Sequence, residues 1–485
     1  MNSNLKTQLE DLKADVVVIG GGGSGLTAAV TAAETGARVI VLEVRRVTGG
    51  NSALAGWIFS TRTPGQKKED ITASNDEYFR KQMLYAHWRT NPRIVRALID
   101  KSEDVIGWLE KWGVECSSMP GFPMYRINGP GKGGTIVVRA LDQKCQDLGV
   151  KMICQTRARK LITDGHKVTG VLAEAGDKKI KIHTGSVILA TGGFAGNREL
   201  LKKYISSFQE PDEMYLQGLP HQGDGLIMAS EIGAATDGSI LLEISQLIFP
   251  WAEHLAIVAR HPETIWLNKK GERFLDESVG FPYFTNAIFK QPSKIFYAIF
   301  DEKTKQGILS SEISPMEAAN IPAGSWPSQV DPDLETQASK GRVKITSSWE
   351  EMGEWMGADP ETLKSTIDEY NTNCDYGRDS IFAKDRKHLL PLRVPPFYAI
   401  KCCVSLLVTH GDIKVNHRME VIDKQANPIS GLYAAGDDTG DIDAGAYNIG
   451  LPGHSFGFAI NSGRIAGENA AEYAFKLRYS GRKAK

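Results

Sequence analysis

The stretch that decides the fold is ADVVVIGGGGSGLTAAVTAAETGARVIVLE, residues 14–43. Its first six residues form a short apolar run, which is typical of a strand buried on both faces. The alanine-rich segment 26–35 predicts a helix, and the apolar run 38–43 predicts a second strand. A strand, a helix and a strand within about 30 residues predict a βαβ unit with parallel strands.

The glycine-rich loop after the first strand indicates a ligand. Three of its glycines have the spacing G-x-G-x-x-G: the first allows a tight turn, the second lets backbone amides approach a pyrophosphate, and the third packs helix on strand. An acidic residue at the end of the second strand is placed to accept ribose hydroxyls. We therefore predict a dinucleotide-binding site that includes Gly20, Gly22, Gly23, Ser24, Gly25 and Glu43.

The composition excludes several classes of protein. The chain has 485 residues, 41% of them apolar and 24% charged, so it is neither disordered nor fibrous. With 57 Lys and Arg against 58 Asp and Glu, it has no overall field to attract nucleic acid or anionic lipid. Glycine is the unusual entry, with 49 residues against a usual share of about 7%. This excess predicts many places where the backbone approaches another group closely, either a ligand or another part of the chain.

The cysteines and the chain start bear on compartment. The six cysteines have no C-x-x-C spacing, which argues against a disulfide framework, an iron–sulfur cluster, attached haem or a zinc site, so we expect no metal. The start, MNSNLKTQLEDLK, lacks the apolar stretch of a secretory signal, and no run of about 18 apolar residues occurs. We therefore expect a cytoplasmic protein without a membrane span.

The pattern along the chain predicts a discontinuous domain. Residues 151–182 alternate as in a small antiparallel meander, and 186–191 form another buried-strand run. Proline, tryptophan and charged residues then become frequent, before the βαβ pattern is expected to resume near residue 398. We predict one domain from the two outer segments and an inserted domain between them, with bounds 1–238, 239–396 and 397–485.

Further motifs narrow the ligand. They are GGNSALAG at 49–56, ILATGGFAGN at 188–197, GLYAAGD at 431–437 and SGRIAG at 462–467. With these motifs the chain resembles, over its whole length, the fumarate reductase and 3-ketosteroid dehydrogenase group of FAD flavoproteins. The resemblance implies an α/β fold: a Rossmann-like FAD-binding domain of the glutathione-reductase type with an inserted α+β cap domain.

The resemblance also implies which further residues contact FAD. The first GG segment would lie along the flavin, the TGG segment by the pyrophosphate, and the acid after the AG pair by the ribityl chain. The helix that begins near Ser455 would aim its N-terminus at flavin N1 and O2. The expected contacts are Gly49, Gly50, Asn51, Ser52, Ala158, Thr191, Gly192, Gly193, Asp224, Gly436, Asp437, Gly453, Ser455 and Phe456.

Two more expectations concern the cofactor. Succinate dehydrogenases carry a histidine before the GG segment for covalent attachment, whereas this chain has Thr48 there, so FAD is expected to be non-covalent. The glycine excess would then mark backbone against FAD in the clusters 20–25, 49–50, 192–193, 436 and 450–467.

The charges that would bind a dicarboxylate are missing at the matching positions. Fumarate reductases use an arginine shortly after an RFxNE string; here the matching string is RFLDES, and Phe281 takes the place of the arginine. A second family arginine corresponds to Gly450, and a family histidine corresponds to Val408. A dianion without these partners would be left desolvated, so the resemblance argues against a dicarboxylate substrate.

The same positions agree better with ketosteroid dehydrogenases. There a tyrosine after the arginine string handles the proton, a role that falls to Tyr283, although an ordinary half-buried cap tyrosine is the alternative. The family's ketone-holding tyrosine and glycine correspond to Tyr447 and Gly453, in a string two residues longer. His410 lies in a loop expected beside the flavin, where it contacts substrate or flavin, or else is structural. These four residues form the predicted catalytic set.

Together these expectations describe an FAD-dependent oxidoreductase. We expect hydride transfer between flavin N5 and the carbon β to a carbonyl, an external electron donor or acceptor, and no nucleic-acid partner. A largely apolar substrate is expected from an aromatic-rich cap containing Phe249, Trp251, Phe281, Tyr283 and Phe284. Two alternatives stay open. The first is a fumarate- or urocanate-type enoate reductase that uses relocated charges such as Arg260, although we expect Arg260 and His261 to be a solvated surface pair. The second is a flavin electron carrier without a substrate site.

Overall fold

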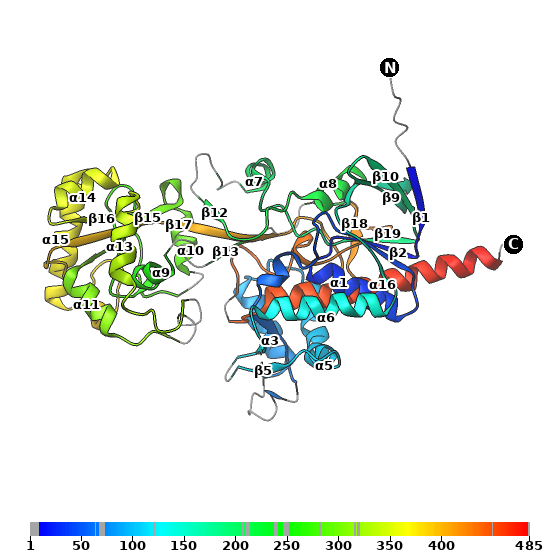
Figure 1. Cartoon of the computed structure of the whole chain (residues 1–485), viewed down its shortest axis with the longest axis horizontal. Helices are drawn as coiled ribbons and strands as arrows, with labels where there is room; N and C mark the ends of the chain where they lie inside the picture. The colour runs from blue at the N-terminus through cyan, green and yellow to red at the C-terminus, as the bar shows by residue number, and fades with distance from the viewer. Residues whose placement is uncertain are drawn as a thin grey trace, which may run out of the picture. The chain divides into compact units, whose positions relative to one another are not determined.

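The chain forms two compact units (Figure 1). The first comprises Met1–Ile205, Gly218–Glu243 and Leu407–Lys485, and the second comprises Ser206–Gln217 and Ile244–Leu406. The computed structural model describes residues 9–63, 65–66, 73–119, 122–205, 208, 214–236, 241–245, 252–280, 283–314, 317, 321–448 and 450–483.

A large mixed sheet forms the centre of the first unit. Its order is β1-β10-β9-β19-β11-β2-β3-β7, with β18 paired to β19 and β8 to β9. Neighbours from β19 to β7 are parallel, whereas β8, β9 and β10 form the expected antiparallel meander. The bounds are β1 Leu9–Lys13, β2 Val16–Ile19, β3 Val39–Leu42, β7 Lys151–Ile153, β8 Arg157–Asp164, β9 Lys167–Ala175, β10 Lys178–His183, β11 Ser186–Leu189, β18 Glu420–Ile422 and β19 Pro428–Ala434.

The apolar runs of the sequence became the inner strands. Every residue of β2, β3 and β11 is buried, as a strand covered on both faces requires. A small second sheet of the same unit has the order β4-β6-β5. Its strands are β4 Trp57–Phe59, β5 Cys116–Ser118 and β6 Met124–Ile127.

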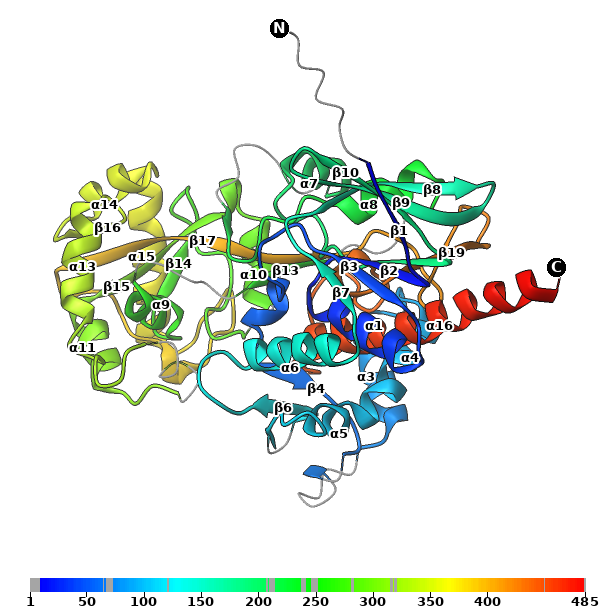
Figure 2. The same ribbon diagram turned by 45° about the vertical axis from the view of Figure 1, so that its right-hand side comes forward.

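Helices α1, α6 and α16 lie side by side in both views (Figures 1 and 2). A Cβ on Gly463 would lie 2.3 Å from the backbone oxygen of Ser24, and one on Gly467 would lie 2.5 Å from that of Ala28. These two glycines therefore let α16 pack closely on α1, and the expectation that the whole 450–467 cluster lies against FAD is wrong. The helices of the unit are α1 Gly23–Glu34, α3 Asn75–Tyr85, α4 Pro92–Lys101, α5 Val105–Glu110, α6 Gly133–Asp147, α7 Arg198–Tyr204, α8 Asp224–Glu231 and α16 His454–Lys483, with 3-10 turns η1 Gly50–Leu54, η2 Ser102–Asp104 and η5 Gly436–Asp438.

The second unit contains its own sheet, with the order β12-β17-β15-β14 and with β16 also paired to β17. The expectation that the βαβ pattern resumes near residue 398 is wrong, because β17 is one long strand antiparallel to β15 and β16. The strands are β12 Met214–Leu216, β14 Ile265–Leu267, β15 Ile295–Asp301, β16 Val343–Thr346 and β17 Phe397–His410. The helices are α9 Glu253–Arg260, α10 Tyr283–Phe289, α11 Glu302–Ser310, α13 Val330–Ser339, α14 Trp349–Met356 and α15 Pro360–Tyr376, with η3 Pro292–Lys294 and η4 Arg386–His388.

Two of the four boundaries between the units fall inside strands. β13 (Leu241–Ser245) is divided after Glu243, and β17 is divided after Leu406. The expected bounds were 238/239 and 396/397, and the second of these lies at the start of β17. A strand shared between units leaves no break in hydrophobic pattern at the division, so the sequence carries no local signal for it.

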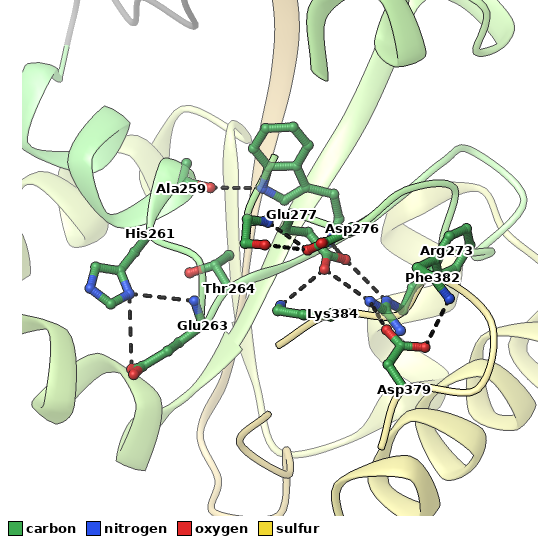
Figure 3. A network of polar contacts seen from close by, with 12 residues as sticks. Ala259, His261, Glu263, Thr264, Arg273, Asp276, Glu277, Asp379, Phe382 and Lys384 are labelled. Atoms are coloured by element: carbon green, nitrogen blue, oxygen red, sulfur yellow. Dashed lines mark hydrogen bonds and ion pairs between the residues drawn. The ribbon is translucent and has the colours of Figure 1, made fainter. Parts of the chain in front are cut away.

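A network of four charged side chains is buried in the second unit (Figure 3). Glu277 accepts hydrogen bonds from Arg273 and Lys384, both at 2.9 Å, and Arg273 also contacts Asp379 at 3.0 Å. Burial alone would raise the pKa of Glu277, but the charges of Lys384 and Arg273 outweigh it and lower the pKa. The two positive and two negative charges of the network cancel. Its ion pairs connect the segments around 273–277 and 379–384.

Candidate functional site

A cavity of about 310 Å³ lies in the first unit, beside the ends of β2 and β3. It is lined by most of the residues that the sequence assigned to the cofactor. These lining residues are Gly20, Gly22, Gly23, Ser24, Glu43, Gly50, Asn51, Ser52, Ala158, Thr191, Gly192, Asp224 and Asp437.

The glycine-rich loop has the geometry that its spacing predicts. Gly20 has a positive φ of 109°, and a Cβ on it would lie 2.1 Å from the Ala190 oxygen. A Cβ on Gly25 would lie 1.9 Å from the Gly20 oxygen, so the third glycine lets α1 begin against the turn. Gly22 precedes α1 and has no side chain to cap it, and Gly23 N donates to Ser52 Oγ at 3.1 Å, so Ser24 and Gly25 carry the first-turn amides that have no intrahelical acceptor.

Glu43 is held in place by backbone amides. Its Oε2 accepts a hydrogen bond from Gly21 N at 2.7 Å, and its Oε1 accepts one from Arg45 N at 2.8 Å. The side chain is buried and lines the cavity. Because each carboxylate oxygen has further lone pairs, the group can still accept hydroxyl hydrogens from a ribose.

Seven of the expected cofactor contacts lie outside the cavity lining: Gly25, Gly49, Gly193, Gly436, Gly453, Ser455 and Phe456. Two of them, Gly193 and Gly436, make close contacts within the protein instead. Gly193 N donates to Asp438 at 3.1 Å, and a Cβ on Gly436 would lie 2.5 Å from Ser24 Oγ. These glycines allow segments next to the cavity to approach one another.

Sequence reasoning missed three residues of this site. Asp438 accepts hydrogen bonds from Thr191 N at 2.5 Å and from Gly193 N, and burial raises its pKa. His221 lines the cavity, and burial lowers its pKa to about 4. Arg157 forms an ion pair with Asp224 at 2.6 Å. Asp438 could have been found from the sequence, because it directly follows Asp437, which was already expected to contact the cofactor.

The cavity fits an FAD molecule. Asn51 Nδ2 is buried and has no hydrogen-bond partner within the described chain, whereas its Oδ1 accepts from Leu219 N at 2.7 Å. An oriented donor of this kind lines the cavity together with the glycine loop and the Glu43 carboxylate. Amides for a pyrophosphate and an acceptor for a ribose are the groups that a dinucleotide requires.

A second cluster surrounds the start of α16. Gly453 N donates to the Tyr447 hydroxyl at 3.1 Å, so the structure brings together the two residues expected to hold a ketone. Gly453 N–H donates to the Tyr447 hydroxyl, so the two groups do not both donate directly to one ketone oxygen as expected. The Tyr447 ring is buried and stacks on the His454 ring, with centroids 4.2 Å apart and planes at 25°.

His410 connects this helix end to the cavity. Its Nδ1 lies 3.3 Å from Asp437 Oδ1, and its Nε2 lies 3.4 Å from Ser455 Oγ. His410 is 2% exposed, and Asp437 lines the cavity. The imidazole is therefore packed between a cavity residue and the first turn of α16.

The remaining predicted residues belong to the second unit. Tyr283 is the first residue of α10 and is 58% exposed. Arg260 and His261 are half-buried, so the expectation of a solvated pair is wrong; Arg260 Nε donates to the Ala256 oxygen at 3.1 Å, and burial lowers its pKa. Of the aromatic cap residues, Phe249, Trp251 and Phe281 lie outside the described residues.

Comparison with known proteins agrees with this cavity. Residues 15–450 match the family described as FAD binding domain. The chain is 31% identical to a vinyl phenol reductase of Lactiplantibacillus plantarum, over 95% of this chain and 96% of that protein. It is 29% identical to a fumarate reductase (cytochrome) of Shewanella frigidimarina, over 95% of this chain and 78% of that protein.

A solved structure shares the fold. The 3-ketosteroid Δ1-dehydrogenase of Sterolibacterium denitrificans superposes with a TM-score of 0.76 at 19% identity, covering 95% of this chain and 99% of that one. Within the described chain, no helix combines the length and the apolar character needed to cross a membrane. The family match over most of the chain, joined to the glycine loop and its cavity, shows that this protein belongs to the FAD binding domain family and is an FAD-dependent oxidoreductase related to C=C reductases.

Proposed function

We propose that this protein reduces a C=C bond conjugated to a neutral group, either a carbonyl, which accepts the electron pair, or a phenol ring. The observation that carries the proposal is the Tyr447–Gly453 pair, which lies at the start of the helix that reaches the FAD cavity through Ser455 and His410. The two named relatives are reductases, which favours reduction over dehydrogenation.

The protein's own groups bind and activate the substrate. The glycine loop, Glu43 and Asn51 would hold FAD, which when bound would supply hydride-transfer chemistry to one carbon of the C=C bond, with electrons coming from an external donor. Because Gly453 N–H donates to the Tyr447 oxygen, that bond does not use the hydroxyl hydrogen of Tyr447, to which we assign the role of donor to the oxygen of a carbonyl substrate. The other carbon of the C=C bond receives a proton; the resemblance of the sequence assigns this transfer to Tyr283, which lies in the second unit and is 58% exposed. The C=C π bond breaks as two C–H bonds form.

A neutral substrate is favoured because uncharged residues occupy the positions where a dicarboxylate site would have charged side chains. Val408 is buried in β17 and Gly450 has no side chain. A dianion bound there would be desolvated without a cationic partner, which is costly. The similarity to a vinyl phenol reductase adds phenolic alkenes to the enones that the ketosteroid-like positions favour.

An enoate reductase is the second candidate. It is supported by the similarity to a fumarate reductase and by the half-buried Arg260, a cation already partly removed from water. This candidate requires Arg260→Ala to abolish turnover of a carboxylate substrate. Under the proposal that we favour, the same variant retains enone or vinyl phenol reduction.

The test is anaerobic reoxidation of bound FAD. Protein reduced with dithionite is mixed with an enone, 4-vinylphenol, acrylate or fumarate, and flavin absorbance is followed. The proposal predicts reoxidation by a neutral conjugated alkene at least about 100-fold faster than by fumarate, a difference of about 3 kcal/mol in barrier. Fumarate as the fastest oxidant would contradict it.

The same preparation tests the attachment of the cofactor. We propose that FAD is held without a covalent bond, since Thr48 takes the place of the attaching histidine. Acid precipitation should leave the yellow flavin in the supernatant. Flavin retained in the protein pellet would contradict non-covalent binding.

A further inference from the structure

A buried charged pair lies directly beneath Tyr447. His454, the first residue of α16, and Asp443, in the loop before it, have side chains only 4% and 1% exposed. Gln82 of α3 donates from Nε2 to Asp443 Oδ1 at 2.7 Å, and its own Oε1 accepts from Asn448 Nδ2 at 2.8 Å. The pair is therefore held by a chain of amides that reaches from α3 to the loop.

Both ring nitrogens of His454 face acceptors. Nδ1 lies 2.7 Å from the Leu451 backbone oxygen, and Nε2 lies 2.7 Å from Asp443 Oδ2. A carbonyl oxygen cannot donate, so Nδ1 must carry a hydrogen. The carboxylate already accepts from Gln82 on its other oxygen, an arrangement suited to the ionised form. A hydrogen on both nitrogens makes the ring an imidazolium.

This ring is stacked on the Tyr447 phenol. The centroids are 4.2 Å apart, and the Tyr447 oxygen also accepts the Gly453 N–H. A cation against the face of a phenol ring and a donor on its oxygen both stabilise negative charge on that oxygen. Asp443 contacts the edge of the imidazole at Nε2, whereas the face of the ring is stacked on Tyr447, so the Asp443 charge cancels the effect only in part.

We propose that His454 is held as an imidazolium by Asp443 and is a positioning residue that makes the Tyr447 hydroxyl a stronger donor and acid toward the substrate. This inference rests on the proposed function, because it assigns the reason why Tyr447 can activate a neutral carbonyl or phenol. It identifies Gln82 as the residue that fixes the charged pair.

Other titratable groups also surround Tyr447 and His454. Tyr85 of α3 donates to the Tyr447 backbone oxygen at 2.8 Å, and Arg89 donates to the Ala444 oxygen at 3.2 Å. On the side of the cavity, His410 and Asp437 face the first turn of α16. Any pH dependence of Tyr447 must therefore be assigned by substitution of His454 itself.

The first test needs no turnover. Nitrogen NMR of the FAD-bound protein labelled with ¹⁵N-histidine, with His454 assigned by its loss in H454Q, should show two protonated ring nitrogens near about pH 7.5, above the usual histidine pKa. A single protonated nitrogen would overturn the inference. His254, another buried histidine paired with an aspartate, Asp333 at 3.0 Å, gives the matched variant H254Q, which should leave the His454 signals unchanged.

The second test reads Tyr447 directly. In FAD-bound protein labelled with ¹³Cζ-tyrosine, and with Tyr447 assigned by Y447F, H454Q should move the Tyr447 titration midpoint up by about one pH unit. H254Q should leave the midpoint in place, and an unmoved midpoint in H454Q would overturn the inference. In turnover, H454Q should lower kcat about tenfold with little change in KM. If no alkene reoxidises FAD, the proposed function fails, whereas both NMR results still decide the state of His454.

Discussion

The two units each bury charged side chains, but they use them differently. In the second unit, Arg273 and Lys384 cancel Glu277 and Asp379, and every charge is directed at another charge. In the first unit, the charged ring of the Asp443–His454 pair has a face stacked on Tyr447. A buried network satisfied within itself serves stability, whereas one with a face against a reactive group can serve chemistry.

The largest expected effect breaks the network of the second unit. Lys384→Met leaves the buried Glu277 and Asp379 with only Arg273 as a cation, so the free energy of unfolding should fall by about 3 kcal/mol. Urea denaturation measures the loss. The double variant E277Q/K384M removes one charge of each sign and should recover at least half of it. A single variant as stable as the parent would show that the network does not hold this unit together.

The next effect concerns Asp438, a buried acid that accepts hydrogen bonds from the backbone amides of Thr191 and Gly193. Thr191 N and Gly193 N donate to different oxygens of Asp438, so an amide here would direct its NH2 donor at one of these two N–H groups, and Asp438→Asn should weaken FAD binding about 100-fold, or about 3 kcal/mol. Flavin fluorescence during titration of apoprotein measures the affinity. The matched control is Asp423→Asn, at an exposed turn where Asp423 accepts from Asn427 N; its FAD affinity should equal that of the parent.

A smaller effect comes from His221, whose pKa lies near 4 in the folded protein because of burial. Below its ordinary value of about 6.5, the unfolded chain binds a proton that the folded chain does not, so stability falls as pH drops from 6.5 to about 4. Urea denaturation of apoprotein at about pH 7 and about pH 4.5 should show a loss of about 2 kcal/mol that His221→Gln lacks. Equal pH slopes for the two proteins would contradict this prediction.

The sequence predicted features that depend on neighbours along the chain. The strands β2 and β3, the loop from Gly20 to Gly25 and the acceptor Glu43 all lie within one βαβ unit. Local spacing fixes their geometry, because turn, helix N-terminus and strand end follow one another directly. The cofactor site could be predicted from the sequence because its residues follow one another closely along the chain.

The features that the sequence did not predict depend on distant partners. Gln82 contacts Asp443 across 361 positions, and Thr191 contacts Asp438 across 247. In both cases an ordinary polar residue gains its role only when the fold brings it to its partner. Gly463 and Gly467 show the reverse: a family motif suggested cofactor contact, but these glycines serve helix packing.

We propose above that Tyr447 activates a neutral conjugated alkene in an FAD-dependent reductase. The most direct test is one turnover of dithionite-reduced, FAD-bound Tyr447→Phe with the alkene that reoxidises the parent fastest. We expect reoxidation about 100-fold slower, with FAD affinity unchanged, since the hydroxyl that donates to the developing negative charge is gone. Reoxidation within a few-fold of the parent rate would contradict it.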